Sequence, residues 1–409
     1  MKIQTAIVFC ILVSAVAFCG CMQTQETTPD NAIANEQVRT VTDSRGIEVT
    51  IPAKIERVAT VSDGLVEEVM YIFGVDDTIV GLGSKGSQFV SNYSYSLDNG
   101  RNLSIEGGKN VALALSPHLK DLPLFMDYGS AMNLETLASL KPDVVIIRLG
   151  SSSFLSGEDE NAQKSIRMIE SLGIPVVVLY TPECAKNADP TEISDEIRII
   201  GNVFGEEKKA EEIIAKLESR EDRIRERTQN ISDDQKLGVL LFGLSSMHRT
   251  ETAAGIAWGL KTTESYIVEN VVNAKNAYRS DVGTFQVINT EQVLAMNPDV
   301  IILGTASGYH PPDELYYAPY YRNLRELDAV KDHHVTSLPY APRNSAERLE
   351  YPINMMVIAK STYPDRFEDI DLNEWVLSFY QDIYGVDYTG AEELRAAQLM
   401  DWCVEDESV

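Results

Sequence analysis

Positive charge is scarce in this sequence, which has 35 lysine and arginine residues against 62 aspartate and glutamate residues and a formal net charge of −27. Nonspecific binding of nucleic acids depends on basic patches that neutralise phosphates. The composition therefore argues strongly against nucleic acid as a partner. It leaves the fold open, because net charge acts on solubility and association rather than on architecture.

Cysteine and histidine are also rare, with five of each. Three cysteines lie within the first 21 residues, so Cys184 and Cys403 remain for the body of the protein. Whether these two form a disulfide is open, because sequence alone does not show that two cysteines are close. Two scattered thiols are no metal framework, and no two histidines have metalloprotease spacing, so we predict no metal site and no resident cofactor.

The N-terminal segment contains an apolar run at residues 6–18 that is too short for a confident membrane span. Lys2 precedes the run, and Phe18-Cys19-Gly20-Cys21 follows it, an arrangement that resembles the lipobox of prokaryotic lipoproteins. We predict that residues 1–21 are a signal peptide and that Cys21 is lipidated; an uncleaved signal anchor is the alternative. Either way, the body is expected outside the cytoplasm, tethered to the outer face of the cell membrane. The polar residues 22–37 predict a flexible linker.

A motif that occurs twice is the strongest structural signal. Residues 133–147 contain Asn-Leu-Glu-Thr-Leu, then Lys-Pro-Asp and an apolar run, and residues 289–303 contain Asn-Thr-Glu-Gln-Val, then Asn-Pro-Asp and a second apolar run. Each copy predicts a short helix, a stop at the proline and a buried strand. Repetition at domain-sized spacing indicates two similar α/β lobes, and two lobes imply a cleft.

Predicted strands alternate with helical segments on both sides of a long helix. The strands are expected at residues 57–62, 78–82, 143–148 and 175–180 in the first half, and at 236–242, 299–304 and 334–338 in the second. Such alternation predicts a parallel sheet in each half, and apolar residues at helical spacing predict a long helix from residue 206 to about residue 229. The expected fold class is α/β, with two Rossmann-like lobes whose central parallel sheets are joined by a long α-helix. We predict an N-terminal lobe at 38–190, a helical connection at 191–232, and a C-terminal lobe with a helical tail at 233–409.

Positively charged residues lie in loops that follow the predicted strands. Ligands of open α/β sheets bind beyond the carboxyl ends of the strands. Lys85, Arg249 and Arg343 are located there, and Arg148 is the last residue of a predicted strand, in an otherwise strongly negative protein. Because arginine binds anions bidentately, these residues predict an anionic ligand. For any single arginine, the alternative is a surface ion pair.

Two enzyme-like motifs each lack a part that their chemistry requires. Residues 81–86 match G-x-G-x-x-G, but the polar residues 87–102 follow where a dinucleotide site needs an apolar helix. Residues 243–247 resemble a nucleophile elbow, but Met247 replaces its closing glycine. An extracytoplasmic hydrolase stays the alternative from a different functional class, and it requires a nucleophile and a base that face the cleft.

Taken in order, these segments resemble the class III substrate-binding proteins of ABC importers, which capture iron–siderophore complexes and cobalamin. Residues 41–49 resemble the opening signature of that family, and both copies of the repeated motif resemble its most recognisable pattern. The long helix resembles the rigid helix that links its lobes. The resemblance implies a non-catalytic protein that works with a permease and its cytoplasmic ATPase. It also implies that Glu135 and Glu291, one in each copy of the motif, dock on arginines of the permease.

The resemblance leaves several ligands open. Residues 351–367 resemble the branch associated with iron complexes, so we expect a complex of the iron(III)–siderophore type. A relative of that branch binds molybdate or tungstate, so capture of an oxyanion is an alternative, and cobalamin is another. Cobalamin pockets favour aromatic residues; Trp258, Tyr309 and Tyr340 are the aromatic candidates for the ligand site, with Phe285 as a further one.

Overall fold

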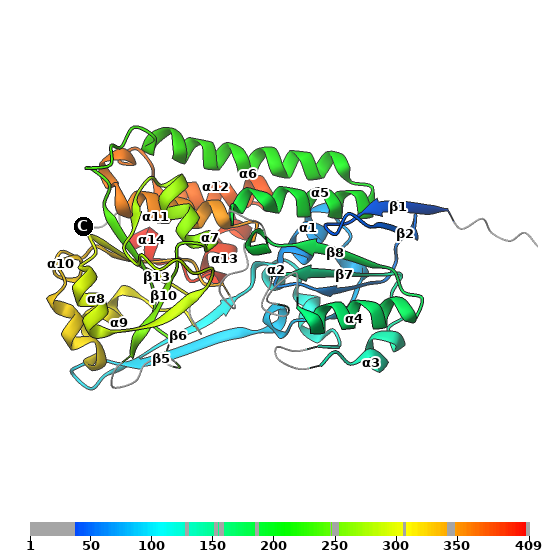
Figure 1. The fold of residues 1–409 in the computed structure, drawn as a ribbon, viewed down its shortest axis with the longest axis horizontal. Helices are drawn as coiled ribbons and strands as arrows, with labels where there is room; N and C mark the ends of the chain where they lie inside the picture. Colours follow the sequence, from blue (N-terminus) through cyan, green and yellow to red (C-terminus); the bar gives the residue numbers. More distant parts are fainter. Residues whose placement is uncertain are drawn as a thin grey trace, which may run out of the picture. The chain divides into compact units, whose positions relative to one another are not determined.

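The computed structural model describes residues 37–126, 131–150, 154, 159–184, 188–245, 247, 253–305, 308–341 and 348–405. These residues form a mixed α/β fold with two separate central sheets (Figure 1). Within those ranges, no helix combines the length and the apolar character that crossing a membrane requires.

The first sheet consists of four parallel strands, and the sequence predicts all of them because each is a short β-branched run between turn residues. In spatial order they are β4 (Ile79–Leu82), β3 (Val58–Val61), β7 (Val144–Leu149) and β8 (Val176–Tyr180). The helices of this half are α1 (Leu65–Phe73), α2 (Val111–Leu115), α3 (Leu134–Ser139) and α4 (Glu160–Ser171). An antiparallel hairpin of β1 (Val38–Thr42) and β2 (Glu48–Pro52) precedes the sheet.

The second sheet has six strands, of which the parallel part is predicted and the antiparallel part is not. Its order is β12 (Phe285–Asn289), β10 (Ala253–Trp258), β9 (Gly238–Gly243), β13 (Val300–Gly304) and β14 (Val335–Ser337), while β11 (Lys275–Asn276) pairs with β9. Strand β10 is antiparallel to both of its neighbours. The sequence analysis missed it because Ala-Ala-Gly-Ile-Ala-Trp is poor in the β-branched residues that mark strands. The helices of this half are α7 (Thr263–Tyr266), α8 (Thr290–Met296), α9 (Pro312–Tyr317) and α10 (Asp328–Lys331).

The duplicated Pro-Asp step has the same structural role in both copies. The backbone N–H of Asp143 donates to the Arg57 carbonyl at 2.8 Å, and the Asp143 carboxylate accepts from the Arg57 N–H at 2.9 Å. Asp299 makes the same pair of bonds with Gly238, at 2.8 and 2.7 Å. Each aspartate thus fastens the start of its own strand to the start of the neighbouring strand, and this explains why the motif recurs with its aspartate.

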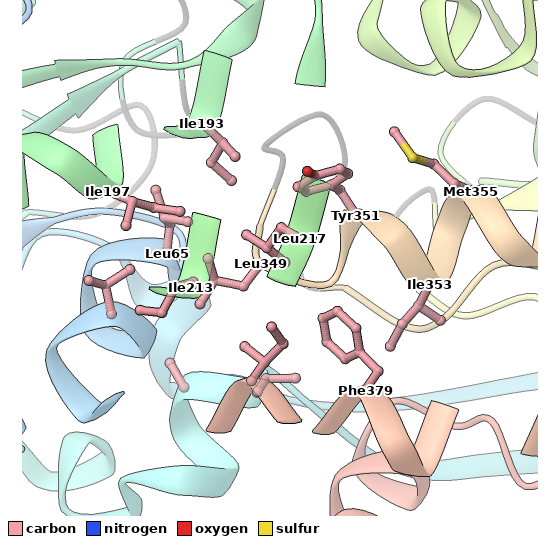
Figure 2. Packing of buried hydrophobic residues seen from close by; sticks show 14 of the residues in the cluster. Leu65, Ile193, Ile197, Ile213, Leu217, Leu349, Tyr351, Ile353, Met355 and Phe379 are labelled. Atoms are coloured by element: carbon pink, nitrogen blue, oxygen red, sulfur yellow. The ribbon is translucent and has the colours of Figure 1, made fainter. Parts of the chain in front are cut away.

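The long helix α6 (Glu207–Thr228) follows α5 (Ile193–Phe204) and lies against both halves, within two residues of its predicted ends. Its 22 residues extend about 33 Å. Ile213 and Leu217 of α6 belong to one hydrophobic cluster that also contains Leu65 of the first half and Ile302 of the second. Figure 2 shows this cluster, with side chains from α1, α5 and α6 meeting those from residues 349–355 and 379. The two halves therefore share a core.

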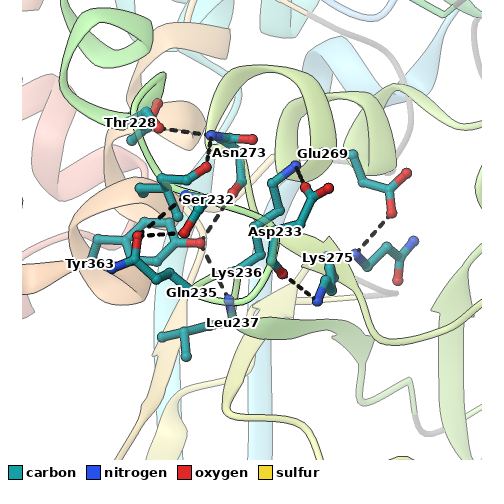
Figure 3. Close-up of polar contacts among 12 residues, drawn as sticks. Thr228, Ser232, Asp233, Gln235, Lys236, Leu237, Glu269, Asn273, Lys275 and Tyr363 are labelled. Atoms are coloured by element: carbon teal, nitrogen blue, oxygen red, sulfur yellow. Dashed lines mark hydrogen bonds and ion pairs between the residues drawn. The ribbon is translucent and has the colours of Figure 1, made fainter.

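The C-terminal end of α6 is fixed to the second half by polar contacts (Figure 3). The Asn273 side-chain amide donates to the Thr228 carbonyl at 2.8 Å, and the Thr228 hydroxyl donates to the Val271 carbonyl at 2.9 Å. The Tyr363 hydroxyl then donates to the Asn273 carbonyl at 3.1 Å and accepts from the Leu237 N–H at 3.3 Å. These bonds satisfy carbonyls that a helix end leaves without an intrahelical partner.

The C-terminal tail is helical, as predicted. It contains α11 (Tyr351–Thr362), α12 (Leu372–Tyr384), α13 (Tyr388–Ala397) and α14 (Trp402–Glu405). Asp371 caps α12, and Asp387 caps α13. Cys184 and buried Cys403 are both free thiols, so they do not form the disulfide that the sequence left open.

A long hairpin replaces the helix that a dinucleotide motif would require. Strands β5 (Val90–Ser96) and β6 (Asn102–Lys109) pair over seven positions and extend to the second half. Tyr95 belongs to the hydrophobic cluster beneath the second sheet, and the Tyr93 hydroxyl donates to Glu314 of α9 at 2.6 Å. The Asp98 N–H donates to the Tyr317 carbonyl at 3.0 Å. The hairpin is thus a further connection between the halves, beside α6.

Candidate functional site

The carboxyl ends of the two sheets meet at Asp63 and Arg348. Asp63 follows β3 of the first sheet, and Arg348 lies between β14 and α11 of the second half. The Arg348 Nε donates to the Asp63 carbonyl at 2.7 Å, and both residues are buried. Because ligands of open α/β sheets bind beyond the carboxyl ends of the strands, this meeting point is the candidate site.

The loop that carries Asp63 is held by several hydrogen bonds. The Asn110 amide donates to the Asp63 carbonyl at 2.8 Å, and the Ser84 hydroxyl donates to the Asp63 carboxylate at 3.1 Å. Gly64 follows with φ of 126°, where a Cβ atom would lie 2.7 Å from the Asn110 side chain. A glycine is required there, since a left-handed backbone and a close contact both disfavour any side chain.

A cavity of about 70 Å³ opens at the carboxyl ends of β13 and β14. By comparison with the space that one buried water needs, it has room for about five waters or a short organic chain. Its lining combines apolar, charged and amide side chains, and comprises Leu241, Trp258, Glu264, Ile267, Gly304, Thr305, Leu338, Pro339, Ala341, Arg348, Glu350, Tyr351, Asn354, Ile358 and Gln398.

Trp258, the last residue of β10, forms one wall of this cavity. The indole is 2% exposed and lies so close to Gly304 that a Cβ there would be 2.7 Å from the ring. Asn276 fixes this wall, because its amide donates both to the Trp258 carbonyl and to the Ser265 hydroxyl of α7, each at 3.0 Å. The indole and the helix that carries Glu264 are therefore held together by one side chain.

Acidic side chains dominate the electrostatics. Burial raises the pKa of Glu264 to about 7. Burial also raises the pKa of Glu350, and it raises that of Glu68 well above its usual range, where the nearby Glu350 carboxylate adds to the effect. Tyr384 donates hydrogen bonds to Glu350 and, at 3.4 Å, to Glu68. Arg348 is thus a single guanidinium among several carboxyl groups, so the cavity is not a concentrated positive site.

Three polar atoms of the cavity lining have no hydrogen-bond partner among the described residues. They are Oε2 of Glu264, Oε2 of Glu350 and the indole Nε1 of Trp258, and each atom is buried. A buried polar group without a partner costs about 1–3 kcal/mol. A hydrogen-bond partner for these atoms has to come from water or from a ligand in the cavity.

The residues predicted from the sequence are distributed unevenly around this site. Trp258 lines the cavity, whereas Tyr309 and Tyr340 are buried in adjoining loops and are not among its lining residues. Lys85 is exposed in the turn that follows β4. Arg249 and Arg343 lie outside the described residues, as does Cys21.

Arg148 is fully buried and forms a bidentate ion pair. Its Nε and one terminal nitrogen donate to the Glu196 carboxylate at 2.6 and 2.8 Å, and neither side chain is exposed. Burial acts to lower the pKa of Arg148, but the Glu196 carboxylate outweighs it, so the pKa is raised. This ion pair joins β7 to α5. In the described part of the chain, Arg148 therefore makes a structural contact.

Sequence reasoning missed Arg348, Glu264, Glu350, Asn354 and Gln398. Arg348 belongs to the same connection as Arg343, so the second arginine of that loop was a detectable signal. Glu264 follows β10, which the sequence analysis missed, and an isolated acid in a short helix carries no pattern. Gln398 comes from the tail, whose proximity depends on how α13 packs.

Glu135 and Glu291 occupy matching positions. Each is exposed in the first turn of its helix, α3 or α8, and each helix is capped by an asparagine, Asn133 or Asn289, whose side chain accepts a backbone N–H bond. Negative charge is favourable at a helix N-terminus. The two carboxylates face solvent and lie on the helices that precede β7 and β13.

The cavity lies at the carboxyl end of the second sheet, and the described residues that line it all come from the second half of the chain. Residues 108–342 match the model of a family described as periplasmic binding protein. The chain belongs to this family. It is an extracytoplasmic solute-binding component of an ABC importer, of class III, and it works with a permease and an ATPase without catalysis of its own.

Relatives of known sequence or structure agree with this assignment. The chain is 25% identical to the molybdate-binding protein MolA of Haemophilus influenzae, with 95% of this chain and 98% of that protein covered. It is also 25% identical to an uncharacterised ABC transporter substrate-binding lipoprotein of Bacillus subtilis, with 90% and 100% covered. A periplasmic solute-binding protein from Veillonella parvula has the same fold, with a TM-score of 0.69, 22% identity, and 90% of this chain and 99% of that chain covered.

Replacement of Arg148 by methionine is expected to reduce the free energy of unfolding by about 3–5 kcal/mol, because Glu196 would keep a buried charge without its partner. Urea unfolding of the purified protein measures the loss. The double variant Arg148→Met, Glu196→Leu should recover most of the stability, since both charges are removed together. A single variant as stable as the wild type, with ligand binding abolished, would show instead that Arg148 acts on the ligand.

Proposed function

We propose that this chain captures an iron(III) complex of an organic chelator, of the siderophore type, where the carboxyl ends of its two sheets meet. The observation that supports the proposal is the mixed lining of the cavity, in which an indole, a guanidinium and two carboxyl groups face one space. An organic chelate offers apolar surface, hydrogen-bond donors and acceptors to such a lining. Pockets for small molecules characteristically combine apolar walls with a few placed polar groups.

Molybdate is the second candidate, because a relative at 25% identity over almost the whole chain is named a molybdate-binding protein. The cavity volume of about 70 Å³ suits so small an ion. The charges favour it less, since Glu264 and Glu350 would repel a dianion unless both carboxyl groups were protonated. Cobalamin remains an alternative, and the one observation that favours it is the aromatic side chain of Trp258 in the cavity lining.

We further propose that the two sheets belong to two lobes with the boundaries expected from the sequence, 38–190 and 233–409, linked by the helical segment 191–232. The shared core around α6 and the contact of the β5–β6 hairpin with α9 support limited closure. In such an arrangement the loops around Asp63 and Arg348 adjust to the ligand while the sheets keep their relation. Lys85, Tyr309, Tyr340, Arg249 and Arg343 stay candidate ligand contacts of these loops.

Titration of intrinsic tryptophan fluorescence tests the ligand class. We expect ferric hydroxamate siderophores to quench the emission saturably, because Trp258 lines the cavity, and molybdate and cobalamin to leave it unchanged. Trp258→Phe should remove the response, while Trp375→Phe, whose ring contacts Arg220 on α6, should retain it as the matched control. A saturable response to molybdate alone would contradict the proposed ligand.

We also propose that Glu135 and Glu291 dock on the permease, one from each copy of the motif. The double variant Glu135→Ala, Glu291→Ala should keep its ligand affinity and lose stimulation of the permease ATPase, because two charge-assisted contacts to arginine are removed. The loss of stability should be limited to about 0.3–1 kcal/mol per helix start. Glu160→Ala, Glu207→Ala, which removes exposed first-turn acids from α4 and α6, is the control. Unchanged stimulation by the Glu135/Glu291 variant would assign the duplicated glutamates to structure only.

Lipid anchoring at Cys21 is proposed from the signal-like segment and its final cysteine. The variant Cys21→Ser should accumulate as an uncleaved precursor or appear in the soluble fraction, without incorporation of labelled palmitate. Lipid label in that variant would place the anchor elsewhere.

A further inference from the structure

The cavity beside Trp258 is lined by the carboxyl group of Glu264, which is hydrogen-bonded with Thr262 and with its own backbone and keeps one buried oxygen without a partner among the described residues. Glu264 is the second residue of α7, and its Oε2 is buried without a hydrogen-bond partner among the described residues. An ionised carboxylate in such a place is costly, so it either binds a proton or meets a partner supplied from outside. Because the residue lines a cavity rather than packed core, an external partner can reach it.

The wall next to this carboxyl group is suited to a cation. The face of an indole attracts ammonium groups, and the attraction grows where water is excluded. Trp258 lines the same cavity, and Asn276 holds the end of β10 to α7 by bonding both the Trp258 carbonyl and Ser265. A carboxylate and a buried indole that share one small cavity form the combination that recognises a protonated amine.

The size of the cavity sets how much of a ligand it takes. About 70 Å³ is too small for a whole ferric chelate and sufficient for a short chain that ends in an amine. The bulk of the complex would then lie outside it, toward Arg348 and the Asp63 loop, where the two sheets meet. The cavity is thus a subsite for one arm of the ligand.

We propose that Glu264 is a specificity-determining residue, which binds a protonated amine on an arm of the iron complex while that arm lies against Trp258. This inference rests on the proposed capture of an iron complex. It adds a rule of selection, in which complexes that carry a free amine are preferred over complexes of the same chelating groups without one.

Because Glu264 can bind a proton, the preference for a ligand with an amine should depend on pH in one definite direction. Burial raises the pKa of this group to about 7, so the ionised form, which attracts the amine, is lost as the pH falls below that value. Among the described lining residues the other charged groups are Arg348 and Glu350, and on α7 itself Tyr266 donates to Asp189. These groups act on a ligand without the amine as well. A comparison of two ligands that differ in the amine therefore isolates the effect of Glu264.

Ferrioxamine B, a linear trihydroxamate with one primary amine, and ferrioxamine E, its cyclic counterpart without the amine, form a matched pair of probes. Their affinities for the full chain are measured by calorimetry between about pH 6 and about pH 8. At the upper pH, we expect ferrioxamine B to bind about tenfold to a hundredfold more tightly than ferrioxamine E, which is the gain typical of a charge-assisted hydrogen bond. The preference should shrink by at most about tenfold per pH unit as the pH falls below 7.

Glu264→Gln should abolish both the preference and its pH dependence, and a urea unfolding transition like that of the wild type shows that the variant is folded. Glu226→Gln, at an exposed position on α6, is the matched control and should bind both probes as the wild type does. Equal affinities for the two probes, unchanged in Glu264→Gln, would overturn the amine subsite and leave the capture of iron complexes standing. Binding of molybdate alone, tighter at low pH, would overturn both.

Discussion

The shared hydrophobic core around α6 is the constraint on which the rest of the structure depends. Ile213, Ile214, Leu217 and Ile224 of this helix are buried in a cluster that includes side chains from beneath both sheets. Full burial of each such side chain contributes about 1.5–3 kcal/mol, so separation of the two halves would expose a large part of the core. The carboxyl ends of the two sheets are therefore held facing each other without a ligand, and the contact between Arg348 and Asp63 spans them.

The buried acidic side chains are an exception within this rigid structure, because their burial lowers the stability of the fold. Glu264 and Glu350 line a cavity whose described lining contains one guanidinium, that of Arg348, and Glu68 shares the Tyr384 hydroxyl with Glu350. Burial raises the pKa of such carboxyl groups and lowers the stability of the fold unless a partner binds to them. Residues that break the rule of satisfied burial often lie at functional sites, and Glu264 and Glu350 line the candidate site.

The sequence predicted the strands and the long helix better than it predicted the candidate site. Strands β3, β7, β9 and β13 are short apolar runs bounded by turn residues, and the apolar spacing of α6 marks its buried stripe, so local pattern and tertiary structure agree there. Arg148 shows the limit, because no pattern in the sequence points to its ion-pair partner Glu196 on a later helix. Glu264 and Gln398 reach the cavity only through packing, and no spacing rule in the chain connects them.

The central claim is that a ferric complex binds where the carboxyl ends of the sheets meet, with one arm in the cavity beside Trp258 and Glu264. A crystal structure of the full chain with ferrioxamine B, with anomalous diffraction recorded at the iron edge, tests it most directly. The account predicts an iron peak beside Arg348 and the Asp63 loop, and continuous density for the amine arm that ends at Glu264. An iron peak elsewhere, with the cavity still filled by solvent, would contradict it.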